Sequence, residues 1–294
     1  MSKVVVDASQ SVEVTILLPA FNEEQSIGKT IRKIKHLYPD YEILVVDDGS
    51  TDRTREEAVM AGAHVWKHPY NIGNGAAVKT GLRYASGEWI LMMDADGQHQ
   101  PEDIARLLEH KNDYDMVIGA RSRGSNTSWH RDLANMIYNR LASYVTKFKV
   151  EDLTSGFRLV KNDRINKYIY LLPNTFSYPS TITMAYLRSG LSIKYVPIQT
   201  LARKGKSKIK LFQDGVRFFL IITKIATLFS PFRVFLPVSF LFFIIGLGYY
   251  LFTYITQHRF TNMSMLLLSS SVIIFMMGLV SEQISQIRYD RVED

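Results

Sequence analysis

The tripeptide Asp94-Ala95-Asp96 places two carboxylates one residue apart, directly after the apolar run 89–93. A short apolar run bounded by polar residues is typical of a buried strand. Ligand sites in open α/β sheets lie at the carboxyl ends of such strands. Two carboxylates at that position can bind one hard cation, Mg2+ or Mn2+, together with the phosphates of a substrate.

Two further polar clusters follow predicted strands. The apolar run 12–18 leads into PAFNEE at 19–24, and the run 42–46 leads into DDGSTD at 47–52. In a parallel sheet all three clusters emerge at one edge, where their carboxylates repel one another unless a cation or hydrogen-bond donors are present. Turn and cap chemistry is the alternative for each cluster, and we prefer it for Glu24 and Asp52. Taken together, the three clusters predict a nucleotide and metal site.

The first 200 residues alternate between strand and helix patterns. Helical spacing covers 27–37, 74–84 and 102–110, and a helix near Asp52 can be capped by Ser50 or Thr51. Short strands are predicted at 64–67 and 116–118. Strands separated by helices of this length predict an α/β domain with a mainly parallel sheet and right-handed crossovers.

The C-terminal third contains two uncharged runs, at 234–255 and 263–280. The first, at ~1.5 Å per residue, can cross a hydrocarbon core of ~30 Å. Buried helices of a soluble core are the alternative, which the tandem arrangement disfavours. Lysines and arginines flank the pair at 203–210 and 288–291, whereas the link between the runs holds only Arg259. Basic flanks favour the cytosol, so both termini are expected there and the link outside.

Composition narrows the class of protein further. The 294-residue chain has a formal charge of +7 and no cysteine, which excludes disulfides, thiolate zinc sites and cysteine nucleophiles. The N-terminal segment has no apolar stretch long enough for a signal peptide, so we expect a cytosolic first domain.

The expected organisation is a catalytic domain at 1–202, a basic loop and amphipathic juxtamembrane helix at 203–233, two transmembrane helices at 234–287 and a cytosolic tail at 288–294. Two spans bury little surface, which is compatible with a homo-oligomer.

Several motifs together resemble a family 2 glycosyltransferase with the GT-A, Rossmann-like fold. They are LLPAFNEE at 17–24, VVDDGSTD at 45–52, NIGNGAAVKTGL at 71–82, DADGQH at 94–99 and SGFR at 155–158. Within that family, DLTSGFRLV at 152–160, VPI at 196–198 and RKGKSK at 203–208 resemble the dolichyl-phosphate mannosyltransferase-like group. The resemblance implies an inverting enzyme that moves a hexose from a nucleotide sugar, of UDP-glucose or GDP-mannose type, to polyprenyl phosphate at the cytosolic face of a prokaryotic plasma membrane. No nucleic-acid partner is expected.

The resemblance also implies roles for single residues. A metal, Mg2+ or Mn2+, would be held by Asp94, Asp96 and Gln98, whereas we expect His99 to be structural. The nucleotide sugar would contact Pro19, Phe21, Glu23, Asp48, Lys79, Asp94, Ala95 and Asp96. The acceptor phosphate would meet Arg121, Arg131, Arg158, Arg203 and Ser207. Of these, Asp94, Asp96, Arg131 and Arg203 are the expected catalytic residues. An anionic phosphate attacks without a strong general base, so catalysis would depend on alignment and electrostatics.

Two departures weaken the acceptor assignment. Family members often have a glutamate in the helix before the VPI strand, where this chain has Thr181, and Asn135 stands where a serine is often found. The rival enzyme is a processive polysaccharide synthase, but the Gln-x-x-Arg-Trp motif of that class does not occur. A different lipid acceptor, or a scaffold on a degenerate transferase fold, is the other alternative, and the intact acidic clusters argue against the scaffold.

Overall fold

A computed structural model describes residues 12–122, 129–175, 177–200 and 230–293, with side chains outside the description at 129–135 and 288–293. The chain forms two compact units. Of the described residues, the first unit holds 12–122, 129–140, 148–175 and 177–200, and the second holds 141–147 and 230–293. The boundary expected at residue 202 stays a prediction, because it falls outside the described residues.

The first unit is built on a seven-stranded sheet with the order β3-β2-β1-β4-β6-β5-β7. Its strands are β1 (Val14–Ala20), β2 (Glu42–Asp47), β3 (His64–Lys67), β4 (Trp89–Met92), β5 (Met116–Arg121), β6 (Arg158–Lys161) and β7 (Ile193–Ile198). All neighbouring pairs are parallel except β4–β6 and β5–β6, because β6 runs antiparallel to both of its neighbours. The mainly parallel sheet expected from the sequence is confirmed, with one reversed strand that the sequence patterns did not indicate.

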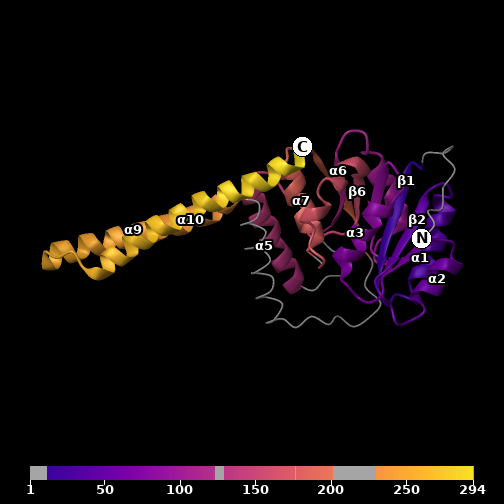
Figure 1. Cartoon of the computed structure of the whole chain (residues 1–294), viewed down its shortest axis with the longest axis horizontal. Coiled ribbons are helices and arrows are strands. Elements are labelled where there is room, and N and C mark those ends of the chain that lie inside the picture. Colours follow the sequence, from indigo (N-terminus) through magenta and orange to yellow (C-terminus); the bar gives the residue numbers. More distant parts are fainter. Residues whose placement is uncertain (1–11, 123–128, 176, 201–229, 294) are drawn as a thin grey trace. The chain divides into compact units, whose positions relative to one another are not determined.

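Helices cover both faces of the sheet (Figure 1). On one face, apolar residues of α1 (Ile27–Leu37), α2 (Thr54–Met60) and α4 (Ile104–Leu108) form one buried cluster with alternate strand residues. On the other face, α3 (Asn74–Tyr84) packs on β1 so closely that a methyl group on Gly81 would lie 2.1 Å from Leu17 Cδ1. The remaining elements are the single turns η1 (Pro101–Asp103) and η2 (Ile169–Leu171) and the helices α5 (Trp129–Thr146), α6 (Asn162–Asn166) and α7 (Tyr178–Arg188).

Local sequence signals placed β1 to β4, α1 and α3 within two residues, whereas β6 and the helices α5, α6 and α7 were not predicted from such signals. The helices at Ile27–Leu37 and Asn74–Tyr84 and the strand His64–Lys67 have the expected bounds. The expected cap of α2 is wrong: the helix begins at Thr54, and the amide of Thr54 donates to Asp52 Oδ1 (3.0 Å), so Asp52 serves the role assigned to Ser50 or Thr51. The predicted amphipathic helix at 211–229 lies outside the described residues.

The second unit is a hairpin of two long helices, α9 (Pro231–Gln257) and α10 (Asn262–Glu293). Both are long and apolar enough to cross a membrane, with mean hydropathies of 2.1 and 2.2 over the candidate spans Pro231–Gln257 and Asn262–Ile287. Only 11% and 17% of their most apolar windows are buried, whereas core helices of a soluble protein are mostly buried. The exposed apolar surface therefore favours membrane spans over the soluble alternative.

Small residues form the interface between the two helices. The hydroxyls of Ser239 and Ser271 each donate to the carbonyl oxygen of the other residue, at 2.9 and 3.0 Å. Methyl groups on Gly246 and Gly278 would lie 3.0 Å from Leu267 Cβ and 2.9 Å from Phe235 Cβ. Close backbone approach and interhelical hydrogen bonds of this kind hold helices together where lipid removes the hydrophobic driving force.

Hydrogen bonds connect the N-terminal turn of α9 to α10 and to the carboxyl end of α5. The amide of Phe232 donates to Glu282 Oε2 (3.2 Å), so a carboxylate from α10 satisfies a free amide of the first turn of α9. The Arg233 guanidinium donates to the carbonyl oxygens of Tyr144 and Val145 at the carboxyl end of α5. A cation at that end of a helix interacts favourably with the helix dipole.

Candidate functional site

The Asp94-Ala95-Asp96 loop leaves the carboxyl end of β4 and turns sharply at Gly97, which has φ of +75°. Asp94, Asp96 and Gln98 are partly buried, and Ala95 is buried. The amide of Gln98 donates to Asp96 Oδ1 (3.1 Å), which fixes the turn. The loop thus presents three oxygen-bearing side chains at the edge of the sheet predicted from the sequence.

Ser26 links this loop to the one that follows β1. Its hydroxyl lies 2.9 Å from the Ala95 carbonyl oxygen and 3.1 Å from Glu23 Oε2. Glu23 therefore lies near the acidic loop, as its expected role requires. Pro19 is buried in β1, whereas Phe21, immediately after that strand, exposes 42% of its surface and offers an aromatic face at the same edge.

The loops that follow β1 and β2 are joined by reciprocal hydrogen bonds. Asn22, in the left-handed conformation at φ of +56°, accepts from the amide of Thr51 (2.9 Å). The amide of Glu24 donates to Asp52 Oδ2 (3.2 Å), and Glu24 Oε2 accepts from the amide of Arg53 (3.1 Å). The turn and cap roles preferred for Glu24 and Asp52 are therefore those seen in the structure.

Asp48 is committed to holding a loop. Its carboxylate lies 2.7 Å from His68 Nδ1 and accepts from the amides of Ile72 (3.0 Å) and Gly73 (2.8 Å), and the residue is only 2% exposed. His68 Nε2 lies 2.9 Å from the Thr80 hydroxyl, which extends the network into α3. Asp48 thus shapes the 68–73 loop beside the site, and direct contact with a base or ribose stays a prediction.

Lys79 points to a neighbouring loop in this structure. Its ammonium donates to the carbonyl oxygen of Leu172 (3.1 Å). Burial lowers the pKa of Lys79 below its usual range, and the charge of Arg83 adds to that effect. The N-terminus of α3 is also closely covered, because a methyl group on Gly75 would lie 2.1 Å from the Pro173 carbonyl oxygen. The contact of Lys79 with a donor therefore stays a prediction.

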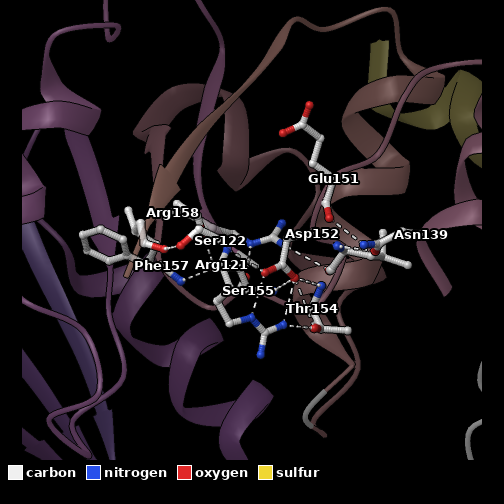
Figure 2. Close-up of polar contacts among 12 residues, drawn as sticks. Arg121, Ser122, Asn139, Glu151, Asp152, Thr154, Ser155, Phe157 and Arg158 are labelled. Carbon is white, nitrogen blue, oxygen red and sulfur yellow. Dashed lines mark hydrogen bonds and ion pairs between the residues drawn. The ribbon is translucent and has the colours of Figure 1, made fainter. Parts of the chain in front are cut away.

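Arg121 forms an ion pair with Asp152 at the end of β5 (Figure 2). Its Nε and Nη2 donate to Asp152 Oδ2 (2.8 Å) and Oδ1 (2.9 Å), and Nη2 also donates to the Thr154 hydroxyl. Burial by itself would raise the pKa of Asp152, but hydrogen bonds and charge from Arg121 outweigh burial and hold that pKa below its usual range. Much of the donor capacity expected for an acceptor phosphate is thus used within the protein.

Arg158 occupies a buried position that does not match its expected role at the acceptor phosphate. The residue is 0% exposed, and its guanidinium donates to the carbonyl oxygens of Ser155 (2.6 Å) and Leu153 (3.1 Å) and to the Thr183 hydroxyl (2.6 Å). A phosphate in solution or in the membrane does not contact a guanidinium that is buried in this way. The assignment of Arg158 to the acceptor phosphate is therefore wrong in this structure, and Arg158 anchors the turn instead.

The other acceptor candidates lie outside the described side chains. Arg131 is in the first turn of α5 and Asn135 lies further along the same helix. The side chains of both residues lie outside the described part of the structure. Arg203 and Ser207 fall in the 201–229 gap. Their roles stay predictions. Thr181 is 3% exposed in α7, and its hydroxyl donates to the Ser177 carbonyl oxygen (3.2 Å).

Residues 15–169 of the 294 match a family model described as Glycosyl transferase family 2. The chain belongs to this family. It is therefore a glycosyltransferase, and the resemblance of its motifs is confirmed. Residues 230–287 of the transferase match a second model, described as the GtrB C-terminal hairpin, which supports a membrane-anchored protein.

Three curated relatives are 29–34% identical to the transferase over the aligned residues. An uncharacterized protein of Methanocaldococcus jannaschii is 34% identical over 229 residues, covering 72% of this chain and 93% of its own. Undecaprenyl-phosphate mannosyltransferase of Micrococcus luteus is 30% identical, over 67% of this chain and 88% of its own. Polyprenol monophosphomannose synthase of Mycolicibacterium smegmatis is 29% identical, over 66% and 80%.

Solved structures confirm the GT-A-like fold. Glucosyl-3-phosphoglycerate synthase of Mycobacterium tuberculosis, crystallised with Mn2+, UDP-glucose and phosphoglyceric acid, aligns with a TM-score of 0.59 and 21% identity. The alignment covers 73% of this chain and 78% of that one. At this identity the likeness concerns the fold alone.

The oxygen-bearing side chains of the 94–99 loop are too few to hold a cation by themselves. In the ranges that the structure describes, no group of three or more His, Asp or Glu side chains could hold a metal by itself. Asp94, Asp96 and the Gln98 amide supply hard oxygens, so a cation there needs further oxygens from a bound ligand. That is the usual arrangement for Mg2+, which binds one or two carboxylates together with substrate phosphates.

Several residues at the site escaped the sequence reasoning. His68 pairs with Asp48, 20 positions away, and Asp152 pairs with Arg121, 31 positions away. No local pattern signals such pairs.

His99 is 7% exposed, its ring stacks on Phe157 at 5.1 Å, and its Nδ1 has no hydrogen-bond partner among the described residues. Its buried, packed position agrees with the structural role expected for it.

Proposed function

We propose that the transferase moves one hexose from a nucleotide-diphosphate sugar to polyprenyl phosphate at the cytosolic face of a prokaryotic plasma membrane. The observation that supports this most strongly is the combination of the acidic β4 loop with a C-terminal membrane hairpin in one chain. A sugar acceptor dissolved in lipid explains why a nucleotide-sugar domain has its own membrane anchor. Relatives named for undecaprenyl phosphate and polyprenol support the same acceptor class.

The reaction we propose is a single displacement with inversion. A phosphate oxygen of the lipid forms a bond to the anomeric carbon while the bond from that carbon to the donor β-phosphate oxygen breaks. The nucleoside diphosphate leaves with the bonding electrons, and no proton need be removed from an ionised phosphate. A divalent cation, Mg2+ or Mn2+, neutralises charge on the leaving diphosphate when bound.

The protein groups then have separate tasks. Asp94, Asp96 and Gln98 would supply the oxygens that hold the cation beside the donor diphosphate. Pro19, Phe21, Glu23, Asp48, Lys79 and Ala95 form the donor pocket, with Asp48 acting through the 68–73 loop that it holds. Arg131, Arg203 and Ser207 meet the lipid phosphate, whereas Arg121 stays paired with Asp152 and holds the turn that follows it. Arginine suits this task because its planar fork matches phosphate oxygens.

A label-transfer assay tests the proposal directly. Membranes containing the transferase are incubated with polyprenyl phosphate and radiolabelled UDP-glucose or GDP-mannose, and the chloroform-extractable label is measured. We expect label in the lipid phase with one donor, dependent on added lipid phosphate. Label that appears only as free sugar or as water-soluble polymer contradicts the polyprenyl acceptor, and the absence of any donor turnover supports the scaffold alternative.

A further inference from the structure

The turn Asp152–Arg158 lies against the acidic β4 loop at two points. A methyl group built on Gly156 would lie 3.0 and 3.2 Å from the two carboxylate oxygens of Asp94, so that carboxylate rests directly on the backbone of Gly156. One residue later, the Phe157 ring stacks on His99 at 5.1 Å with an interplanar angle of 18°. The turn therefore contacts both ends of the loop 94–99.

Two buried charged groups hold this turn in place (Figure 2). Asp152 Oδ1 accepts from the amides of Thr154 and Ser155, both at 3.1 Å, while Arg121 holds the same carboxylate from β5. From the opposite side, Arg158 donates to the carbonyl oxygens of Leu153 and Ser155. With both amides and carbonyls engaged, the turn has little freedom to shift.

Gly119 in β5 holds the turn against the sheet. The Ser155 hydroxyl donates to the Gly119 carbonyl oxygen (2.6 Å), and the Gly119 amide donates to the Phe157 carbonyl oxygen (2.9 Å). A methyl group on Gly119 would lie 2.5 Å from Phe157 Cδ1, so the missing side chain makes room for the ring that supports His99. The contact between Phe157 and His99 therefore depends on how Gly119 of β5 places the turn.

We propose that the Asp152–Arg158 turn is a rigid template for the β4 loop, and that Gly156 is the positioning residue that sets the Asp94 carboxylate. The inference rests on the proposed function, because it assigns the position of Asp94 a purpose in binding the metal and the donor diphosphate. A side chain at position 156 would press on the carboxylate from the backbone side.

The distances determine how large the effect should be. A carbon 3.0–3.2 Å from carboxylate oxygens is too close, so a methyl group displaces Asp94 by a few tenths of an ångström. Mg2+ requires near-ideal octahedral geometry, and catalytic groups lose rate steeply when misplaced. We therefore expect Gly156→Ala to weaken divalent-cation binding about tenfold and Gly156→Val to weaken it more.

Mn2+ binding to the purified full-length transferase is the direct test. Free Mn2+ is followed by electron paramagnetic resonance during titration with UDP or, in parallel, GDP. The matched control is Gly248→Ala, because a methyl group on Gly248 meets no atom within 4 Å. We expect weaker Mn2+ binding in Gly156→Ala, normal binding in Gly248→Ala, and partial recovery of sugar transfer by Gly156→Ala at high Mn2+. A purely structural defect would not be rescued by metal.

The outcomes separate this inference from the proposed function. Unchanged Mn2+ affinity in a folded Gly156→Ala variant overturns the inference while leaving the function intact. Failure of the wild type to bind Mn2+ with either nucleotide overturns the metal site and the inference with it. If Gly156→Ala does not fold, Ser155→Ala loosens the turn without adding atoms and should weaken Mn2+ binding a few-fold; no change there overturns the template.

Discussion

The acidic residues at the carboxyl edge of the sheet divide by what their carboxylates contact. Those of Asp48 and Asp52 accept several hydrogen bonds from neighbouring loops and thereby hold the backbone around the site. The Asp94 carboxylate instead rests on Gly156, and the Asp96 carboxylate accepts from the amide of Gln98 within its own turn. Asp48 and Asp52 therefore shape the backbone of the site, and Asp94 and Asp96 are the carboxylates expected to meet the metal.

Replacing Asp96 by asparagine tests the metal role. Asp96→Asn keeps the side-chain shape but removes a charge, so we expect transfer to fall by at least about 100-fold while the protein stays folded and in the membrane. That loss corresponds to roughly 2.7 kcal/mol of transition-state stabilisation. Initial rates of label transfer give the comparison, with the exposed Asp40→Asn as control. Full activity in excess EDTA would rule out the metal.

The Arg121–Asp152 pair tests the architecture of the turn. Asp152→Asn leaves a largely buried guanidinium without its anion, which should cost about 2–3 kcal/mol of stability and lower the thermal midpoint at pH 7. The folded-state pKa of Asp152 is depressed, so its stabilisation is present above the unfolded pKa of about 3.9 and is lost as pH falls through the lower folded value. The midpoints of wild type and variant should therefore converge below about pH 4. Equal midpoints at pH 7 would show that the pair contributes nothing.

At the scale of elements, the hairpin packs through small side chains. Ser239 and Ser271 exchange hydrogen bonds, and Gly246 and Gly278 allow close approach to the partner helix. The rest of each helix exposes large apolar side chains. A helix pair that binds its neighbour through small residues and faces lipid with large ones follows the general pattern of membrane helices.

Two glycines of α9 provide a matched test of this interface. Gly246→Leu places a side chain against Leu267 and Leu268, where a methyl group would already lie 3.0–3.2 Å from their carbons. Gly248→Leu points into open space. We expect a lower thermal midpoint and faster proteolysis for Gly246→Leu only, measured in detergent or nanodiscs. Equal behaviour of the two variants would mean that the helices do not pack as described.

At the scale of the whole molecule, the chain joins a family 2 glycosyltransferase domain to a hairpin of two long apolar helices. The basic segments 203–210 and 288–291 flank that hairpin, while its link holds one arginine. By the positive-inside tendency, we predict that the catalytic domain and both termini are on the cytosolic side. A donor from the cytosol and an acceptor from the membrane could then meet at the same face.

Cysteine labelling tests this topology. The chain has no cysteine, so single cysteines at Ser2 and Asn262 report without background. In sealed vesicles of known orientation, a membrane-impermeant maleimide should label the two positions from opposite sides. Labelling of both from the same side would exclude a transmembrane hairpin with cytosolic termini.

Separate binding measurements can divide donor from acceptor chemistry. Arg131→Ala and Arg203→Ala should each reduce kcat/KM for the lipid by about 10- to 150-fold, the equivalent of losing one charge-assisted contact of roughly 1.5–3 kcal/mol. Nucleotide-sugar affinity, measured by calorimetry, should stay near that of wild type. The exposed Arg55→Ala serves as control, and lysine replacements should rescue only partly. A loss of donor affinity with unchanged lipid KM would assign these arginines to the donor pocket.

The sequence by itself determined the alternation of strands and helices as far as β5, the three polar clusters at one edge and the two apolar spans. Each of these depends on hydrophobic periodicity or turn chemistry within about 20 residues, and local interactions decide such features. The tertiary structure alone decided that β6 reverses, that Asp48 holds His68, that Arg121 binds Asp152 and that Arg158 is buried beneath its own turn. Whether an arginine meets a phosphate or a buried carbonyl depends on which strands become neighbours and which face a side chain takes. Those contacts join residues far apart in the chain or across a turn, and no local pattern encodes them.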